Sequence, residues 1–329
     1  MATTKLSSGS ETIKANTSPP STILLGLSGP SSSGKTTLAR LLRSIFNLTV
    51  PSPSSPGATN KISLFILHQD DFYLTDALVP VITVSSTEFG TRDLQDWDCV
   101  ESLDLDIFES TLRHVKQHGT VPEGSVSKED QNAVGESGVS DDEVKRLRGV
   151  VEERLRASSS TSTTTTKDTG DNNNNSSSDR ELRICILDGF LLYPPPPPPP
   201  SEPASSISTP LTHLHALSSS LLAPRLFLPS TRTQTLTRRA RRTGYVTLEG
   251  FWTDPPGYVE DVVWPNFARD HAWMYSGGDV DGGSIDEESL LRDHGVRVCP
   301  GRGTWDMQRV LEWAVGVLVE EVEARVAGV

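Results

Sequence analysis

The sequence predicts an α/β fold with a central parallel sheet of about five strands flanked by helices. Short apolar runs alternate along the chain with stretches in which apolar residues recur at helical spacing, an order typical of parallel sheets. A glycine-rich phosphate-binding motif, residues 29–36 (GPSSSGKT), follows the first apolar run. Three low-complexity stretches leave this motif intact, so we expect them to be disordered insertions into the fold.

Five apolar runs are the expected strands. The first three are continuous, which is the pattern of strands covered by helices on both faces, and the last two are short. The runs are residues 22–27 (TILLGL), 62–67 (ISLFIL), 182–187 (LRICIL), 225–228 and 296–298.

Helical periodicity fills the segments between these runs. Ser140 and Glu143 form a capping-box pattern, which marks the start of a helix. The expected helices span residues 36–46, 103–115, 140–155 and 211–222, with a terminal helix from Thr304 onward.

Composition limits the part of the chain that can pack. We expect a disordered tail over residues 1–21 and one folded domain over 22–329. The expected insertions lie at about 49–60, 157–179 and 194–210, where polar residues and a run of prolines predominate. The proline run could bind a protein partner, whose identity the sequence leaves open.

The charge balance excludes some classes of partner. Lys and Arg number 30 against 43 Asp and Glu, so a net charge of −13 argues against nucleic-acid binding. No apolar run approaches the roughly 20 residues that span a bilayer, so we expect no membrane association. The cysteines Cys99, Cys185 and Cys299 lie far apart, which favours a reducing compartment, the cytoplasm or also the nucleus.

The glycine-rich motif predicts nucleoside-triphosphate binding, although an ordinary Gly/Ser turn is the alternative. Its backbone N–H groups would surround phosphate oxygens, Lys35 would reach the terminal phosphates, and the Thr36 hydroxyl would bind Mg²⁺. The expected ATP-binding residues here are Gly29, Ser31, Ser32, Ser33, Gly34, Lys35, Thr36 and Thr37.

Acidic residues follow two of the expected strands. The second strand runs into residues 68–73 (HQDDFY) and the third into Asp188, so both groups should emerge at the edge that carries the phosphate loop. Asp70 is placed to accept a hydroxyl proton or bind the metal, and Asp188 to hold Mg²⁺ through water. The alternative is that these are solvated acids that begin turns.

A basic segment lies late in the chain. Five arginines and no acid occur within residues 232–242, so a lid over about 232–258 could close on ATP and stabilise the transferred charge. A solvated basic helix face is the alternative. Residues 251–258 (FWTDPPGY) are expected to form a structured loop that could cover an aromatic substrate.

Five blocks together resemble the nicotinamide riboside kinases, which belong to the uridine-kinase-like P-loop kinases, and the insertions make the chain fungal-like. The blocks are residues 26–42 (GLSGPSSSGKTTLARLL), 68–73 (HQDDFY), 96–98 (DWD), 186–192 (ILDGFLL) and 238–264, which begins RRARRTGY. The resemblance implies a P-loop kinase fold and the cofactors ATP and Mg²⁺. It implies phosphorylation of the 5′-hydroxyl of nicotinamide riboside, and of nicotinic acid riboside, in NAD salvage.

The resemblance also implies roles for single residues. Lys35 and Asp70 would be catalytic, with Asp70 as the proton acceptor, and Thr36, Asp70 and Asp188 would hold the metal. Trp97 would stack on the pyridine ring, although partly buried packing is the alternative role, and Asp98 would bind ribose hydroxyls. The implied substrate-binding residues are Asp70, Asp71, Phe72, Tyr73, Trp97, Asp98, Arg242 and Tyr245, and Arg238 and Arg239 would bind ATP. Residues 302–304 fall where the family places a loop beside the adenine.

Two other functions stay open from the residues alone. A related kinase could act on uridine, cytidine or another small alcohol. A protein of another class could bind ATP for regulation, with the insertions as its interaction surface.

Overall fold

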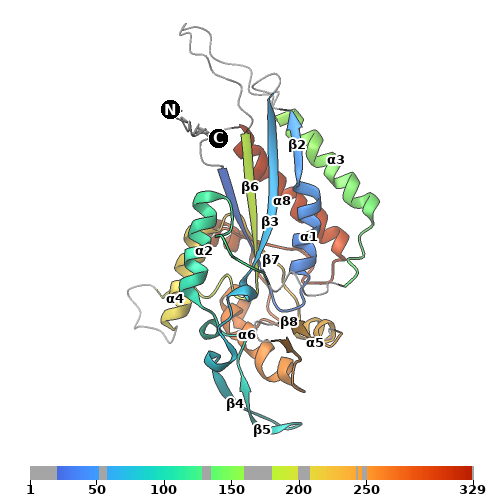
Figure 1. Ribbon diagram of the computed structural model, residues 1–329. Helices are drawn as coiled ribbons and strands as arrows, with labels where there is room; N and C mark the ends of the chain where they lie inside the picture. The colour runs from blue at the N-terminus through green and yellow to red at the C-terminus, as the bar shows by residue number, and fades with distance from the viewer. Residues whose placement is uncertain are drawn as a thin grey trace, which may run out of the picture.

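The computed structural model describes residues 21–51, 58–127, 135–158, 180–198, 208–241, 244–246 and 250–327. Its centre is a six-stranded sheet in the order β10-β7-β1-β6-β3-β2 (Figure 1). Its strands are β1 (Ser21–Ser28), β2 (Leu48–Pro51), β3 (Thr59–His68), β6 (Arg180–Gly189), β7 (Arg225–Phe227) and β10 (Val296–Val298). All neighbours pair in parallel except β2, which pairs antiparallel with β3 at the edge.

Helices cover both faces of the sheet, which explains why its central strands are apolar without alternation. In β1, Ile23, Leu25 and Leu27 face one cluster and Leu24 the other, and all four are fully buried. One face packs against α1 (Lys35–Phe46), α3 (Asp141–Ser158) and α8 (Met307–Ala327). The other packs against α2 (Leu105–His118), α4 (Thr209–Leu221), α6 (Trp264–His271) and α7 (Glu287–His294), and Figure 1 shows α2 and α4 across the sheet from α1, α3 and α8.

A third apolar cluster lies beyond one end of the sheet. It joins Val79, Trp97 and Tyr258 to the valines of η5 (Val259–Val263), one turn of π-helix. The hairpin of β4 (Val81–Ser86) and β5 (Gly90–Gln95) packs on it. Figure 1 shows this hairpin, α5 (Arg232–Arg239) and α6 gathered at this end. The region between the cluster and the strand ends is where the predicted site residues meet.

Local sequence signals fix the helix that carries the arginines. At the start of α5, Thr231 Oγ1 accepts a hydrogen bond from the Gln234 backbone N–H at 3.3 Å, and Gln234 Oε1 accepts from Thr231 N–H at 2.9 Å. This reciprocal capping box satisfies two donors that a helix start leaves unpaired. Asp281 Oδ1 also accepts from Arg232 N–H at 2.9 Å, so the first residue of α5 is bonded to the loop before α7.

The predicted parallel sheet is confirmed, with corrections at its edge. The expected loop at 49–60 is too wide, because β2 covers Leu48–Pro51 and β3 begins at Thr59. Leu48 and Val50 are buried and alternate with exposed neighbours, so this edge strand buries only one face. A run of four residues that includes a proline is too short for its alternation to be recognised.

Other boundaries shift by a few residues. Helix α3 runs two residues into the expected 157–179 insertion, and α4 begins at Thr209, inside the expected 194–210 insertion. The Ser140 cap is confirmed, since its Oγ accepts from Glu143 N–H at 3.2 Å. The terminal helix starts at Met307 instead of Thr304. Residues 52–57, 159–179 and 199–207 of the three insertions and residues 1–20 of the tail lie outside the described residues.

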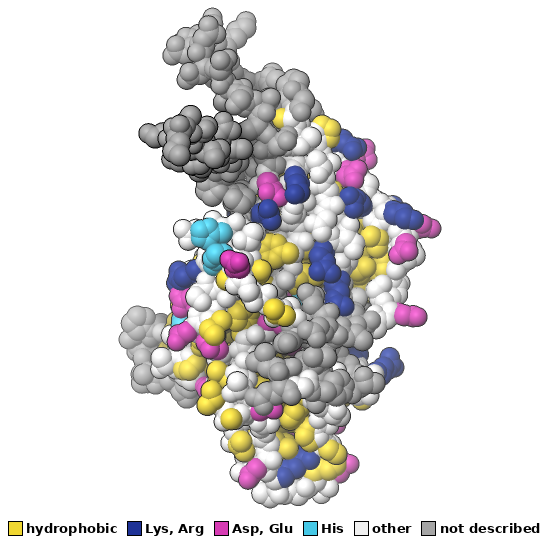
Figure 2. All heavy atoms as spheres, viewed as in Figure 1, with side chains coloured by type: hydrophobic (Ala, Val, Ile, Leu, Met, Phe, Trp, Pro, Cys, Tyr) yellow, Lys and Arg dark blue, Asp and Glu magenta, His cyan; other side chains and the backbone are white. Residues whose placement is uncertain are grey.

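Two further observations concern the surface and the thiols. Among the described residues, no helix combines the length and apolar character that crossing a membrane requires. On the face seen in Figure 2, basic and acidic side chains of the described residues are intermixed. Cys99, Cys185 and Cys299 are all free thiols and buried.

Candidate active site

The phosphate-binding loop connects β1 to α1, and its backbone enters the left-handed region at two positions. Gly34 precedes the helix with φ 97°, and Ser32 has φ 59°, both in the left-handed region. A Cβ on Gly29 would lie 2.4 Å from the carbonyl oxygen of Leu228, so the loop also passes close to the end of β7. Thr37 lies in the first turn of α1 and is partly exposed.

The inside of this loop is rich in hydrogen-bond donors. Lys35 Nζ donates to the backbone oxygens of Gly29 and Pro30, at 3.0 Å each. The hydroxyls of Ser32 and Ser33 are buried without a hydrogen-bond partner among the described residues. Buried polar groups normally find partners, so this concentration of donors at a helix start fits an anionic ligand.

Asp188 meets the phosphate loop from β6, as its position at the strand end predicts. Its Oδ2 accepts from Thr36 Oγ1 at 2.6 Å and lies 3.3 Å from Nδ1 of His68 on the neighbouring strand. Burial raises the pKa of Asp188, but His68, the Lys35 charge and Thr36 outweigh it and hold that pKa below its usual value. An ionised carboxylate beside a hydroxyl is a donor pair that suits Mg²⁺.

Asp70 lies on η1 (Gln69–Phe72), the single turn that follows β3. The turn is fixed by Gln69, which is fully buried. Its Nε2 donates to the Leu191 carbonyl oxygen at 2.9 Å, and its Oε1 accepts from Leu191 N–H at 3.0 Å. Since β3 and β6 are neighbours with His68 opposite Asp188, the turn brings Asp70 to the same edge of the sheet.

Residues after Asp70 point in different directions. Asp71 is partly exposed. Phe72 packs instead into the core, 7 % exposed, with its ring 5.0 Å from that of Phe108. Of the implied substrate contacts, Phe72 therefore packs in the core, in the cluster that includes Phe108 of α2.

An aromatic cluster surrounds the implied ring-binding residue, Trp97. Its ring meets Tyr73 edge-on at 5.2 Å and Trp252 at 5.8 Å between centroids. Tyr73 in turn stacks on Phe190 at 6.0 Å, and Trp252 meets Tyr258 at 5.9 Å. Trp97 itself is 9 % exposed, so packing holds its orientation.

Asp98 is held beside this cluster by Tyr258. The Tyr258 hydroxyl accepts from the Trp97 backbone N–H at 3.0 Å and donates to the Asp98 carboxylate. Burial raises the pKa of Asp98 to about 6, although the nearby Arg239 charge opposes this. Burial also raises the pKa of Tyr73, and the charges of Asp70 and Asp98 add to this effect, so both carboxylates lie near one phenol.

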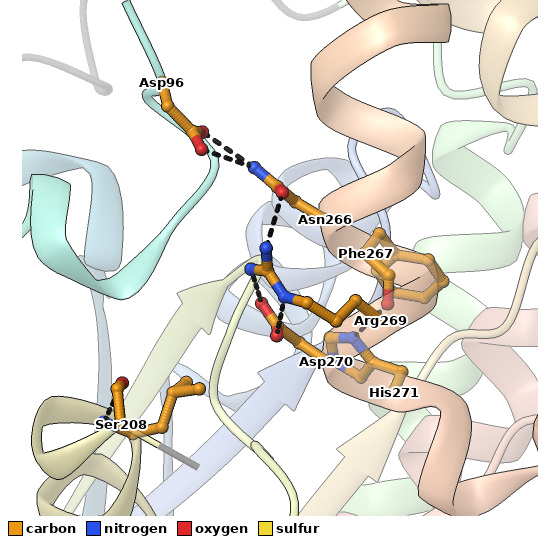
Figure 3. A network of polar contacts seen from close by, with 8 residues as sticks. Asp96, Ser208, Asn266, Phe267, Arg269, Asp270 and His271 are labelled. Atoms are coloured by element: carbon orange, nitrogen blue, oxygen red, sulfur yellow. Dashed lines mark hydrogen bonds and ion pairs between the residues drawn. The ribbon is translucent and has the colours of Figure 1, made fainter. Parts of the chain in front are cut away.

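A buried polar network ties the 96–98 loop to α6 (Figure 3). Asn266 Nδ2 donates to both carboxylate oxygens of Asp96, at 2.7 and 2.9 Å, and Asp96 Oδ1 also accepts from Asp98 N–H at 3.1 Å. Asn266 Oδ1 accepts from Arg269, which forms a bidentate pair with Asp270. The backbone that presents Trp97 and Asp98 is therefore fixed from α6.

Of the arginines that were predicted to form a lid, Arg239 reaches the phosphate loop. Its guanidinium donates to Ser31 Oγ at 2.6 Å and to both oxygens of Asp254, at 2.7 and 2.9 Å. Trp252 Nε1 also donates to Asp254, at 3.1 Å. Arg239 thus contacts both the phosphate loop and Asp254, and Asp254 in turn contacts the aromatic cluster through Trp252.

Arg238 faces a different cleft. Its guanidinium donates to the Gly303 carbonyl oxygen at 2.7 Å. The two residues line a cleft together with the phosphate loop and the segment that follows β10, where Pro300 and Trp305 supply apolar surface. Ser32, Ser33 and Gly34 of the phosphate loop also line this cleft, so it adjoins the donors of the loop.

For two of the implied substrate-binding residues, the structure describes no side chain. Arg242 lies outside the described residues. Tyr245 belongs to β8 (Tyr245–Val246), where its backbone pairs with Trp252 of β9 (Phe251–Trp252).

Sequence reasoning missed several residues that complete the site. Gln69, Phe190, Asp254 and Tyr258 each fix a predicted residue in place. All four lie inside the sequence blocks described above. Their partners are more than a dozen residues distant or lie in other blocks, which a linear pattern does not reveal.

The parallel sheet, the donor-rich loop and the acids at the strand ends define a P-loop kinase. No protein-family model matches the sequence. A protein of Schizosaccharomyces pombe named nicotinamide riboside kinase is 30 % identical over 271 residues, 82 % of this chain and 88 % of the relative. Proteins of that name from Saccharomyces cerevisiae and Eremothecium gossypii are 28 % and 27 % identical, over 79 % of this chain and 82 % and 80 % of their own lengths. The chain belongs to the nicotinamide riboside kinase family.

Proposed function

We propose that this protein uses ATP to phosphorylate the 5′-hydroxyl of nicotinamide riboside, and of nicotinic acid riboside, in NAD salvage. The observation that carries the proposal is the meeting of Asp70, Asp98 and the aromatic cluster beside a phosphate loop. The three fungal relatives described above are each named nicotinamide riboside kinase, which supports the proposal. The free, buried cysteines suit the cytoplasm, which we propose as its location.

The phosphate loop and the cleft beside it would bind ATP. The loop donors would hold the phosphates, and the base would enter the cleft that Arg238 and Trp305 line. The residues fit Mg²⁺, since Thr36 and Asp188 pair a hydroxyl with an ionised carboxylate and Asp70 lies at the same edge. When bound, Mg²⁺ would neutralise part of the phosphate charge.

Asp70 would accept the proton of the attacking 5′-hydroxyl. The Asp70 carboxylate lies on a turn that Gln69 fixes and is only partly buried, so it is held in position and can meet a substrate. Lys35 and Arg239 would balance the charge on the transferred phosphoryl group, because both lie against the loop. In this arrangement catalysis depends mainly on positioning and electrostatics.

The aromatic cluster and Asp98 would recognise the nucleoside. A pyridinium ring is a cation, which aromatic faces attract, and Trp97 is the implied stacking partner. Asp98 can accept hydrogen bonds from ribose hydroxyls. Its Tyr258 partner leaves the carboxylate with further acceptor capacity.

The test is ADP release by the purified protein with Mg²⁺ and ATP. The panel contains nicotinamide riboside, nicotinic acid riboside, uridine, cytidine and pantothenate. We expect turnover with the two pyridine ribosides to exceed turnover with uridine and cytidine by about tenfold or more, because only the pyridine ribosides carry a cationic ring that the aromatic cluster would attract. Turnover confined to uridine or cytidine would agree with a nucleoside kinase activity but refute the proposed specificity for pyridine ribosides. ATP binding without any turnover would refute the activity itself.

A further inference from the structure

Asp96 opens the 96–98 loop, yet the mechanism above gives its side chain no role. The residue is only 5 % exposed and directly precedes the two residues expected to bind the nucleoside, Trp97 and Asp98. The side chain that meets its carboxylate, Asn266 of α6, is also buried. A buried charge is costly unless hydrogen bonds compensate it, so Asp96 depends on the partners that surround it.

Asn266 is the main partner of this carboxylate. Its Nδ2 lies 2.7 Å from Oδ1 and 2.9 Å from Oδ2 of Asp96 (Figure 3). Burial raises the pKa of Asp96, and the Asn266 hydrogen bond is the largest of the effects that oppose this, ahead of the Asp98 N–H and the Arg269 charge. Loss of the Asn266 amide would therefore leave a buried carboxylate without its strongest donor.

The Asn266 amide has only one orientation that satisfies both of its neighbours. Its Oδ1 accepts from Arg269 Nη1 at 2.9 Å, and Arg269 is itself held by a bidentate pair with Asp270. An ionised carboxylate only accepts hydrogen bonds and a guanidinium only donates them, so Nδ2 faces Asp96 and Oδ1 faces Arg269. The contact between α6 and the loop thus depends on the polarity of both side chains.

The Asp96 carboxylate in turn holds the backbone of the loop. The N–H of Asp96 donates to the Pro80 carbonyl oxygen at 2.7 Å, and the N–H of Trp97 donates to the Tyr258 hydroxyl at 3.0 Å. The next N–H, that of Asp98, donates to Asp96 Oδ1 at 3.1 Å. Of these three consecutive groups, only the Asp98 N–H depends on a side chain that Asn266 fixes. A displaced Asp96 carboxylate would therefore release the backbone at Asp98.

Resting on the proposed function, we propose that Asn266 is a positioning residue for nucleoside binding, which holds the Asp96 carboxylate and thereby fixes the backbone that presents Trp97 and Asp98. A loop that is ordered before the nucleoside arrives binds it more tightly, because the cost of ordering does not then oppose binding. The effect concerns the nucleoside and not ATP, since the phosphate loop is held by other contacts, those of Lys35 and Arg239.

The first experiment replaces Asn266 with an isosteric carboxylate. Asn266→Asp sets two carboxylates against each other, so we expect KM for nicotinamide riboside to rise by about tenfold or more, the effect of a lost hydrogen bond to a buried charge. KM for ATP and kcat should change by less than about threefold, because nucleoside contacts that act equally in the ground and transition states affect KM alone. Calorimetric titration with nicotinamide riboside in the absence of ATP should show the same weakening.

A double exchange tests the polarity of the pair. In Asp96→Asn/Asn266→Asp the amide at 96 donates to the carboxylate at 266, and Arg269 keeps an acceptor. The amide oxygen at 96 can still accept from the Asp98 N–H. KM for nicotinamide riboside should return to within about threefold of the wild-type value, as a coupled pair requires. A double variant that binds the nucleoside no better than Asn266→Asp would contradict the pairing.

Asn47→Asp is the matched control. Asn47 follows α1 at the end away from the phosphate loop, where its amide pairs with the backbone N–H and carbonyl oxygen of Leu64 at 2.7 and 3.3 Å. The exchange removes one of these hydrogen bonds, so it should lower the Tm but leave KM for nicotinamide riboside unchanged. If Asn266→Asp also lowers the Tm without changing KM, Asn266 only supports the fold and the inference is wrong.

Asn266→Ala covers the case in which Asn266→Asp does not fold. It removes the amide without adding a charge, and it should raise KM for nicotinamide riboside in the same way. If neither variant folds, the pair serves the fold as a whole and the inference is wrong.

Failure of this inference is distinct from failure of the proposed function. A wild type that releases no ADP with nicotinamide riboside refutes the function. A wild type that phosphorylates nicotinamide riboside, with a KM that the Asn266 variants leave unchanged, refutes only the positioning role.

Discussion

Single charged groups decide what the site can do, and Asp70 is the first to test. Asp70→Asn keeps the shape of the side chain but removes the base, so we expect kcat to fall by about a hundred- to ten-thousandfold. ATP binding should persist, because the phosphate loop is unchanged. Steady-state kinetics and ATP titration measure the two effects. A variant with wild-type kcat would exclude Asp70 as the proton acceptor.

The raised pKa of Asp98 predicts a pH dependence. Burial is its main cause and brings it to about 6, so the carboxylate becomes neutral as the pH falls below this value. A neutral carboxyl is a weaker acceptor and attracts a pyridinium less, so kcat/KM for nicotinamide riboside should fall below about pH 6. Profiles at saturating ATP check this.

Asp98→Asn is the control for this profile. The amide does not titrate, so the inflection near pH 6 should be absent although overall activity is lower. An inflection that persists in the variant would assign that titration to another group.

At the scale of elements, helix α5 carries two arginines near the phosphate loop. Arg239 contacts Ser31 of the loop, and Arg238 lines the cleft beside it. Arg239 uses its planar fork to hold Asp254 and Ser31 together, a geometry that lysine does not reproduce. Arg239→Lys should therefore lower kcat by about ten- to a hundredfold even though the charge is kept. Arg241→Lys, an exposed position two residues further, should have no effect. Equal effects of the two exchanges would contradict this role.

Elements with a strong local period were predictable, and those stabilised by distant contacts were not. The strand before the phosphate loop and the helix after it follow from an apolar run and helical spacing. The β4–β5 hairpin has partly exposed faces throughout, and its inner side packs on η5, about 170 residues later, through contacts such as Arg92 with Asp261. Propensity alone does not carry that information.

The site shows the same division. The loop donors, Asp70 and Asp188 were predictable because parallel strands end at one edge. The ties of Asp98 to Tyr258 and of Asp96 to Asn266 join residues 160 or more positions apart. The resemblance named Trp97 and Asp98, but only the folded chain shows that α6 holds their loop.

For the whole molecule, we expect a core substitution far from the site to lower the free energy of unfolding without changing substrate binding. Leu318 of α8 is fully buried against the sheet face that α1 and α3 share, remote from the acids at the strand ends. Leu318→Ala should lower the free energy of unfolding by about 2–5 kcal/mol through lost burial and a cavity. Urea denaturation measures the loss, and KM for nicotinamide riboside should stay unchanged.

Val150→Ala on α3 is the matched control, because Val150 is 40 % exposed. Its effect on the free energy of unfolding should stay within about 0.5 kcal/mol. Equal losses at the two positions would contradict the assignment of α8 to the core.

The central claim is that this sheet edge transfers phosphate from ATP to the 5′-hydroxyl of a pyridine ribonucleoside. The most direct test is to identify the product formed from nicotinamide riboside by mass spectrometry and phosphorus NMR. We predict nicotinamide mononucleotide, a single 5′-phosphate monoester that forms in step with ADP and forms far more slowly with Asp70→Asn. Formation of ADP without that monoester, or a phosphate on a secondary hydroxyl, would contradict the account.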